Sequence, residues 1–551
     1  MKREEMYARV EGQEPSRPRV SLLLVFVVLS FIAYSAVLNS YFLSDDFAQI
    51  GRVLEGDWSV TWAHATGGFF RPLFILSYVM DAALWRENPL GYHLTNTLLH
   101  AINSLLVCHA ARKLLSAQEL SAKSTQAVSI IASLLFLLHP SHTENVSWIS
   151  GRADLLATVF CLAALLSFIS YVETRRIFHF ILSLISFALA LLAKESAASL
   201  PLILFALCLY FAHGWKGKAA WWRAIKISAP FFAVLFLFIL VRRAALGVWL
   251  GGYGAAQHLN FSPGWVRDRL LQATLRSLLP ALPQTLSTVF LKPLQSPIFI
   301  IAALLFTALI ALLSRRRRRL EAAPTRRAQN RLILFATASF TLSLLPAITL
   351  RLSLFDTQGE RFLYWPSVFA CLVVAHLSFI LLRSMKWWLA LMLCVLAFYS
   401  ISLYRTNQTW REAAALSRSI RDELARDASS SKSIIVINAP DNLRGVPVFH
   451  NGLEEAVRIF QPRASVEAVR VLSLHDIQSL SDEVELKREG DVYSLRLLNR
   501  AAVFARIAER IDCLEIADRS AQSLHFRLSG CADRPALFFY HAGRMYRVMD
   551  E

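Results

Sequence analysis

Long apolar runs recur along roughly the first 400 residues of the chain, and shorter polar stretches separate them. A bilayer-spanning helix needs roughly 20 mainly apolar residues, and about eleven runs approach that length. The pattern therefore predicts an all-α bundle of about eleven transmembrane helices. The expected spans begin near Ser21, Tyr92, Ala127, Leu155, Phe178, Ser199, Ser228, Pro297, Leu332, Val368 and Leu389.

A different pattern begins after Tyr404. "SKSIIVINAP" and "AVRVLSL" predict strands, and "NGLEEAVRIF" predicts a helix. "VELKREGDVYSLRLL" predicts a hairpin that turns at Glu489-Gly490-Asp491. We therefore expect three parts: a tail (1–20), a transmembrane domain (21–404) and a small mixed α/β domain (405–551).

The composition agrees with a membrane protein. Of the 551 residues, 55% are hydrophobic and only 18% are charged, which lies outside the range of ordinary soluble domains. We expect a multi-pass protein of the cell (inner) membrane, with the lipid bilayer as a partner.

The net charge of +18 serves mainly as a topology signal, because the basic residues collect in alternate loops and form no single nucleic-acid-binding face. The positive-inside rule makes those loops cytoplasmic. The N-terminus is then cytoplasmic, and with an odd number of spans the C-terminal domain is extracytoplasmic. The basic residues are Lys2, Arg3, Arg9, Arg17, Arg19, Arg112, Lys113, Lys123, Arg175, Arg176, Lys216, Lys218, Arg223, Arg326, Arg327 and the run 315–319.

Two adjacent carboxylates, Asp45 and Asp46, follow the first apolar run in "SYFLSDDFAQI", on the expected outer face. In one interpretation Ser44 and the two aspartates cap the next helix, because their oxygens satisfy free N–H groups at a helix start. In the other, repulsion and a low-dielectric setting make one carboxylate basic enough to accept a proton near neutral pH.

Further ionisable residues fall on the same face by parity. Such residues are costly at membrane depth and usually line a cavity or a site. Together they offer carboxylates for acid/base chemistry and cations suited to a phosphate. They occur in "GGFFRPLF", "LLHPSHTENVSWISGRADLLA", "LLAKESAASLP" and "DTQGERFLYWPS".

These motifs, in this order with "FLSDDF" and "NPLGYHLTNTLLHAINSLLV", resemble the GT-C glycosyltransferases, and within them the transmembrane O-mannosyltransferases with TPR repeats and their bacterial relatives. The resemblance covers about residues 20 to 400. It implies a polyprenyl-phosphate-linked sugar donor and Asp45 or Asp46 as the catalytic base. It also implies residues that bind the donor phosphate or sugar. The candidates for the phosphate are Arg71, Arg152, Lys194 and Arg361. The other candidates are His93, His139, His142, Glu144, Asp154 and Glu195.

The C-terminal part departs from that family. No 34-residue helical repeat follows residue 404, so the acceptor stays open between a protein and a glycan or lipid. Cys513 and Cys531 are candidates for a disulfide if the domain lies in an oxidising compartment, and the sequence leaves open whether they pair.

Other site classes have weaker support. His139, His142 and Glu144 have a spacing compatible with a divalent cation, but the HExxH order is absent and a polar helix end is the favoured interpretation. No phosphate-binding glycine loop indicates a nucleotide site. A transporter or flippase of lipid-linked or envelope precursors, and a non-catalytic scaffold, are the competing classes, because intramembrane charges also mark permeation paths.

Overall fold

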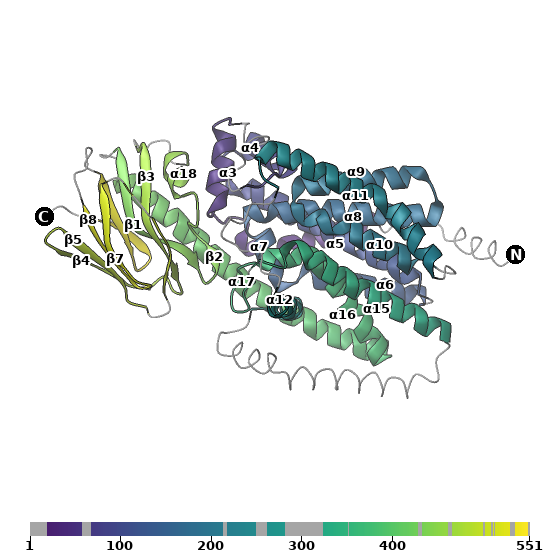
Figure 1. Ribbon diagram of the computed structural model, residues 1–551. Helices are drawn as coiled ribbons and strands as arrows, with labels where there is room; N and C mark the ends of the chain where they lie inside the picture. Colours follow the sequence, from purple (N-terminus) through teal and green to yellow (C-terminus); the bar gives the residue numbers. More distant parts are fainter. Residues whose placement is uncertain are drawn as a thin grey trace.

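The computed structural model describes residues 19–57, 68–118, 120–212, 217–249, 262–281, 323–350, 352–427, 432–460, 466–499, 502–508, 511, 513–528 and 535–548. It has a helical bundle and a C-terminal β domain at one end of the bundle (Figure 1). The expected span near Pro297, the Arg315–Arg319 loop and Cys531 lie outside the described residues.

The bundle consists of α-helices joined by short 3-10 turns. Its helices are α2 (Arg19–Ala33), α3 (Asp45–Leu54), α4 (Pro72–Trp85), α5 (Pro89–Ser116), α6 (Ala122–Leu137), α7 (Thr143–Val146), α8 (Arg152–Thr174), α9 (Ile177–Ala193), α10 (Leu200–Tyr210), α11 (Lys218–Leu246), α12 (Pro263–Arg276), α15 (Ala323–Leu344), α16 (Tyr364–Leu382) and α17 (Met385–Asp427). The 3-10 turns are Ser35–Val37, Pro140–His142, Ile149–Gly151, Glu195–Ser199, Leu345–Ala347 and Glu360–Leu363.

Local sequence accounts for several helix ends. Asn88 caps α5 by accepting the N–H of Leu90 at 3.1 Å, and Pro89 follows at the first helical position, where its missing N–H is no loss. Helix α6 ends at Leu137, and Pro140, which cannot continue an α-helix, begins a 3-10 turn three residues later. Helix α11 ends at Gly247, whose φ of 75° is a left-handed conformation that glycine adopts without strain.

Within the described residues, five helical segments are long and apolar enough to cross a membrane. They match the expected spans near Leu155, Ser228, Leu332, Val368 and Leu389. A sixth comes from α6 and Pro140–Val146, if this pair, bent by 50°, counts as one span. Four more apolar helices are shorter: Leu22–Ala33, Pro72–Trp85, Ile177–Ala193 and Glu195–Tyr210. These helices indicate a multi-pass membrane protein. The total of about eleven spans stays a prediction.

Helix α17 connects the two parts of the molecule. Its 43 residues form one continuous helix that runs from the bundle into the β domain (Figure 1). At about 1.5 Å per residue it is about 65 Å long. The expected domain boundary at 404/405 falls inside this helix, and the first strand of the C-terminal domain begins at Ser433.

The C-terminal domain is built from two sheets. The two predicted strands, the predicted helix and the predicted hairpin are confirmed, and the described part of the domain holds ten strands and one short helix. That helix is α18 (Leu453–Arg458). The strands are β1 (Ser433–Leu443), β2 (Val446–Pro447), β3 (Ala468–Ile477), β4 (Val484–Glu489), β5 (Val492–Leu497), β6 (Phe504–Ile507), β7 (Leu514–Arg519), β8 (Ser523–Leu528), β9 (Ala536–His541) and β10 (Arg544–Arg547).

The first sheet has the order β10-β9-β1-β3-β6, with β1 parallel to β3 and β9, and the second has the order β4-β5-β8-β7. Alternate residues of β1 point to opposite faces. Ile435 and Ile437 pack in the core between the two sheets with Leu495 and Phe526. Ile434 and its neighbours on the other face belong to the main core shared with the helices. The first sheet is therefore the middle of three layers.

Candidate functional site

Asp46 is a buried carboxyl that joins the start of α3 to the segment before α8. Its Oδ1 accepts the backbone N–H of Ser150 at 2.9 Å and the Ser150 hydroxyl at 2.5 Å, and its Oδ2 accepts the N–H of Leu43 at 3.0 Å. Burial raises the pKa of Asp46 to about 7, because these hydrogen bonds only partly offset the lost hydration. Asp46 is 1% exposed, and its hydrogen bonds join the two segments at this junction.

Asp45 has a more open position. It is partly exposed, and its Oδ1 accepts a hydrogen bond of 2.7 Å from the side-chain amide of Asn451 in the C-terminal domain. Ser44 precedes α3 with φ of 47° and makes no side-chain capping bond to the helix. Its hydroxyl instead accepts the N–H of Asn451 at 3.2 Å. The hydroxyl-capping interpretation of this loop is therefore wrong for Ser44.

The segment 139–154, called the hub below, contacts several of the other candidate residues. The indole N–H of Trp148 donates to the carbonyl of Leu43 at 3.2 Å. A Cβ at Gly151 would lie 2.4 Å from the carbonyl oxygen of Glu144, so only glycine fits at this crossing. The hub therefore packs directly against the acidic loop.

Arg152 is completely buried and fully engaged. Its guanidinium donates to the Asn96 side chain at 2.7 Å and the Tyr92 carbonyl at 2.9 Å, and it forms an ion pair of 2.6 Å with Asp81. It also lies over the ring of Tyr78. These partners hold the guanidinium of Arg152 inside the bundle.

Four more of the expected residues form two ion pairs at the same end of the bundle. Lys194 contacts Asp154 at 2.5 Å, and both are buried. Next in sequence, Glu195 receives two hydrogen bonds from Arg71, of 2.9 and 2.5 Å, which is the fork-shaped geometry of an arginine and carboxylate. Arg71 and Glu195 are 14% and 33% exposed, so this pair is reachable from outside.

Glu144 pairs with Arg361 beside Trp148. The backbone N–H and the guanidinium of Arg361 each donate to Glu144 at 2.7 Å. The Arg361 guanidinium also lies over the ring of Trp148. Glu144 is 4% exposed and Arg361 is 26% exposed, so the cation forms the outer part of the pair.

The three candidate histidines have structural partners. His93 contacts the Ser40 carbonyl at 3.2 Å, and His139 contacts the Ser277 carbonyl at 3.0 Å. His142 contacts the Ser367 hydroxyl at 2.8 Å. All three are buried between helices, which agrees with the polar helix-end interpretation of "HPSHTE".

The described residues contain no group of three or more His, Cys, Asp or Glu side chains placed to hold a metal ion.

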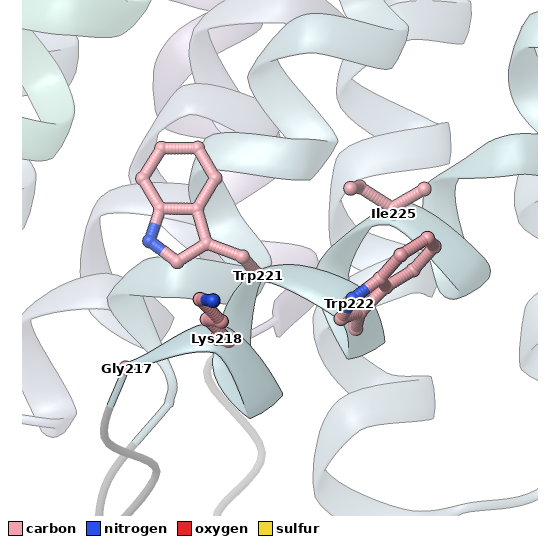
Figure 2. A pocket seen from close by; sticks show the side chains of 5 residues that line it. All are labelled: Gly217, Lys218, Trp221, Trp222 and Ile225. Carbon is pink, nitrogen blue, oxygen red and sulfur yellow. The ribbon is translucent and has the colours of Figure 1, made fainter.

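A cavity of about 300 Å³ lies at the start of α11, lined by Gly217, Lys218, Trp221, Trp222 and Ile225 (Figure 2). Among its described lining residues, Lys218 is the only charged one and none is a carboxylate, so these residues offer no carboxylate base. The acidic pair with its neighbouring ion pairs is the better candidate site.

Sequence reasoning missed four site residues. Ser150 and Asn451 hold the two aspartates, and both are ordinary polar residues without a local signal. Asp81 lies in the apolar run "PLFILSYVMDAALW", where an isolated carboxylate is itself a signal. Arg242, near the end of an apolar helix, donates to the Gly68 carbonyl at 3.1 Å and lies within electrostatic range of Glu195 and Arg71.

The chain is similar in sequence to curated protein O-mannosyltransferases, and no family model matches it. It is 35% identical over 194 residues to the Tmtc1 protein of Drosophila melanogaster, covering 33% of this chain and 22% of the relative. It is 40% identical over 99 residues to TMTC3 of Mus musculus, and this match covers 18% of this chain and 10% of the relative. A Caenorhabditis elegans relative is 31% identical over 207 residues, covering 35% and 28%. The matches thus span less than a third of each relative's own length.

Among solved structures, the Archaeoglobus fulgidus oligosaccharyltransferase, crystallised with zinc and sulfate, aligns with 81% of this chain and 62% of its own, at 12% identity and a TM-score of 0.41. A second structure from the same organism is the oligosaccharyltransferase AglB in complex with an inhibitory peptide and a dolichol-phosphate. It aligns with 89% of this chain and 75% of its own, at 10% identity and a TM-score of 0.39. The resemblance to the transmembrane O-mannosyltransferases is confirmed by the sequence relatives.

Proposed function

We propose that this chain is a membrane glycosyltransferase that moves a sugar from a polyprenyl-phosphate donor to an acceptor hydroxyl on the extracytoplasmic face. The observation that carries the proposal is the acidic pair, with one reachable and one buried carboxylate, at the end of the bundle that also holds the two partly exposed arginines. The sequence relatives, named protein O-mannosyltransferases, support the reaction class. The scaffold would be a GT-C bundle of about eleven spans in the cell (inner) membrane.

In this reaction Asp45 is the catalytic base. It is partly exposed, and among the described residues Asn451 holds its Oδ1, which leaves Oδ2 for the acceptor. The acceptor O–H transfers its proton to Asp45, and its oxygen forms the new bond to the anomeric carbon. The bond from that carbon to the phosphate oxygen breaks, and the phosphate leaves with the electron pair. Asp46 positions this loop through Leu43 and Ser150.

Arg361 and Arg71 are the donor-phosphate contacts in this proposal. Both guanidinium groups are partly exposed at the edges of their ion pairs, so a phosphate can approach them without breaking a buried pair. Arg152 and Lys194 are buried in closed ion pairs and hold the hub in place. The negative charge that develops on the leaving phosphate is stabilised by the exposed arginines.

The donor's two ends suit the two solvents at this site, because hydrocarbon accommodates the polyprenyl tail and water accommodates the sugar. Mannose is the sugar that the names of the relatives suggest, and a hydroxyl oxygen of a protein is the acceptor they suggest. Serine and threonine side chains carry such hydroxyls. A glycan or lipid hydroxyl is the alternative acceptor, because residues 405–551 show no 34-residue helical repeat of the kind found in the resembling family.

The test is transfer by the full-length protein, purified in detergent, from a short-chain polyprenyl-phosphate mannose to a peptide rich in serine and threonine. We expect mannosylated peptide from the lipid donor and none from GDP-mannose. Transfer from the nucleotide sugar with none from the lipid donor would contradict the proposed donor. An absence of transfer combined with movement of the lipid donor across a vesicle membrane would favour a flippase.

A further inference from the structure

The C-terminal domain is attached directly to the acidic loop. The N–H of Ser44 donates to the Val448 carbonyl at 2.9 Å, and the side chain of Asn451 donates to Asp45 at 2.7 Å. The rings of Phe47 and Phe449 stack with their centres 5.9 Å apart. A domain that follows the bundle in sequence therefore forms one wall around the proposed catalytic base.

His450 lies in the same segment, between Phe449 and Asn451. Its Nδ1 lies 2.9 Å from Oδ1 of Asp441 at the end of β1, and its side chain is 59% exposed. The Asp441 side chain is 9% exposed and thus fixes the ring from the protein side. Because Nδ1 is engaged and the side chain is 59% exposed, Nε2 is the ring nitrogen that we expect a ligand to contact.

Charged groups from three elements act on His450. Asp441 comes from β1 and Asp45 from α3, and both favour the charged imidazolium, whereas Arg506 from β6 disfavours it. The hydrogen bond with Asp441 is the largest of these effects and raises the pKa of His450 above its ordinary value. The imidazolium therefore persists to a higher pH than that of an isolated histidine.

We propose that His450, held by Asp441, binds the acceptor by donating a hydrogen bond from Nε2 to an oxygen of the acceptor beside the attacking hydroxyl. The C-terminal domain then supplies the acceptor side of the site, and the bundle supplies the donor side. This inference rests on the proposed function for the identity of the acceptor. A charged donor fits the carbonyl and hydroxyl oxygens of a hydroxyl-bearing peptide.

The experiment measures binding of a fluorescent peptide rich in serine and threonine to the detergent-purified full-length protein, and then transfer from the lipid donor. A charged hydrogen bond contributes about 1.5 to 3 kcal/mol, so His450→Gln should weaken peptide binding roughly tenfold to a hundredfold. The KM for the peptide should rise to match, with little change in kcat or in donor binding. Wild-type peptide affinity should fall as His450 loses its proton at rising pH, and this dependence should vanish in His450→Gln.

His525→Gln is the matched control, because His525 lies on β8 of the second sheet, away from the acidic loop. Asp441→Asn should reproduce part of the binding loss. Failure of the wild type to bind the peptide, or equal peptide affinity and pH dependence in wild type and His450→Gln, would overturn the inference. Peptide binding that depends on His450 without any transfer from the lipid donor would instead contradict the proposed function alone.

Discussion

At the scale of single residues, the two neighbouring aspartates have different environments. Asp46 is enclosed and saturated with hydrogen bonds from Ser150 and Leu43, whereas Asp45 is partly exposed and held by Asn451. The sequence places both carboxylates at the candidate site but cannot distinguish them. The distinction arises from contacts with residues 104 and 406 positions away, which no local pattern encodes.

The buried carboxyl gives a prediction on stability and pH. Its pKa, raised to about 7 in the folded protein, exceeds the value of about 3.9 expected for an unfolded aspartate. The folded state therefore binds the proton more tightly, and this group's contribution to stability is lost as the pH rises through 7. We expect the Tm of Asp46→Asn, measured in detergent from pH 5 to 8, to fall less than that of the wild type. The control is Asp491→Asn, in the exposed hairpin turn. The prediction is contradicted if Tm falls with pH at the same rate in the wild type, in Asp46→Asn and in the control.

The arginines give a second prediction, which separates structural from functional cations. Removing one partner of a buried ion pair costs about 3 to 5 kcal/mol, so Arg152→Met should lower the Tm clearly. Arg361→Ala should leave a folded protein whose donor binding and transfer fall together, roughly tenfold to a hundredfold. Arg361→Lys should recover only part of this loss, because a fork-shaped donor is replaced by a point charge. Normal donor binding by Arg361→Ala would exclude it as a phosphate contact.

At the scale of elements, the length of α17 shows what apolar run length misses. The apolar run ends near Tyr404, but the helix continues to Asp427 because a second, amphipathic pattern takes over. Trp410, Ala413, Ser417, Ile420 and Leu424 are buried at helical spacing. That periodicity was readable in the sequence, whereas the pairing of β6 to β10 into two sheets depends on long-range contacts.

The connection between α18 and α3 gives the third prediction. Gly452 has φ of 84°, and a Cβ there would lie 2.5 Å from the Ser44 carbonyl oxygen and 3.0 Å from Cβ of Phe47. Gly452→Ala should therefore displace the C-terminal domain from the acidic loop and reduce transfer and Tm together. Gly490→Ala is the control, since Gly490 has φ of 62° and open space around it. Loss of transfer to the same extent in both variants would indicate backbone strain alone.

At the scale of the whole molecule, the acidic pair and several of the basic loops lie in different parts of the bundle. The acidic pair and the C-terminal domain share one end (Figure 1). Lys113 pairs with Glu173 where α5 and α8 end, and Gln118 contacts Tyr210 nearby, which brings several of the basic loops together. The sequence could predict this arrangement because the positive-inside rule needs only loop composition.

Topology is the fourth prediction. In a cysteine-free background, a cysteine at Lys123, in the first turn of α6, should react with an impermeant thiol reagent only from the cytoplasm. One at Gly490 should react only from outside. Both positions are exposed, so access depends on the side of the membrane. The opposite labelling pattern would place the acidic pair in the cytoplasm and contradict a donor site on the outer face.

The most direct test of the central claim is the rate of sugar transfer from polyprenyl-phosphate mannose by Asp45→Asn, compared with the wild type and with Asp491→Asn. The amide keeps the shape and the contact with Asn451 but accepts no proton. General-base catalysis contributes roughly 100-fold to 10,000-fold, so we predict a loss of at least about a hundredfold with donor binding retained. A rate within a few-fold of the wild type in a folded Asp45→Asn protein would contradict the account.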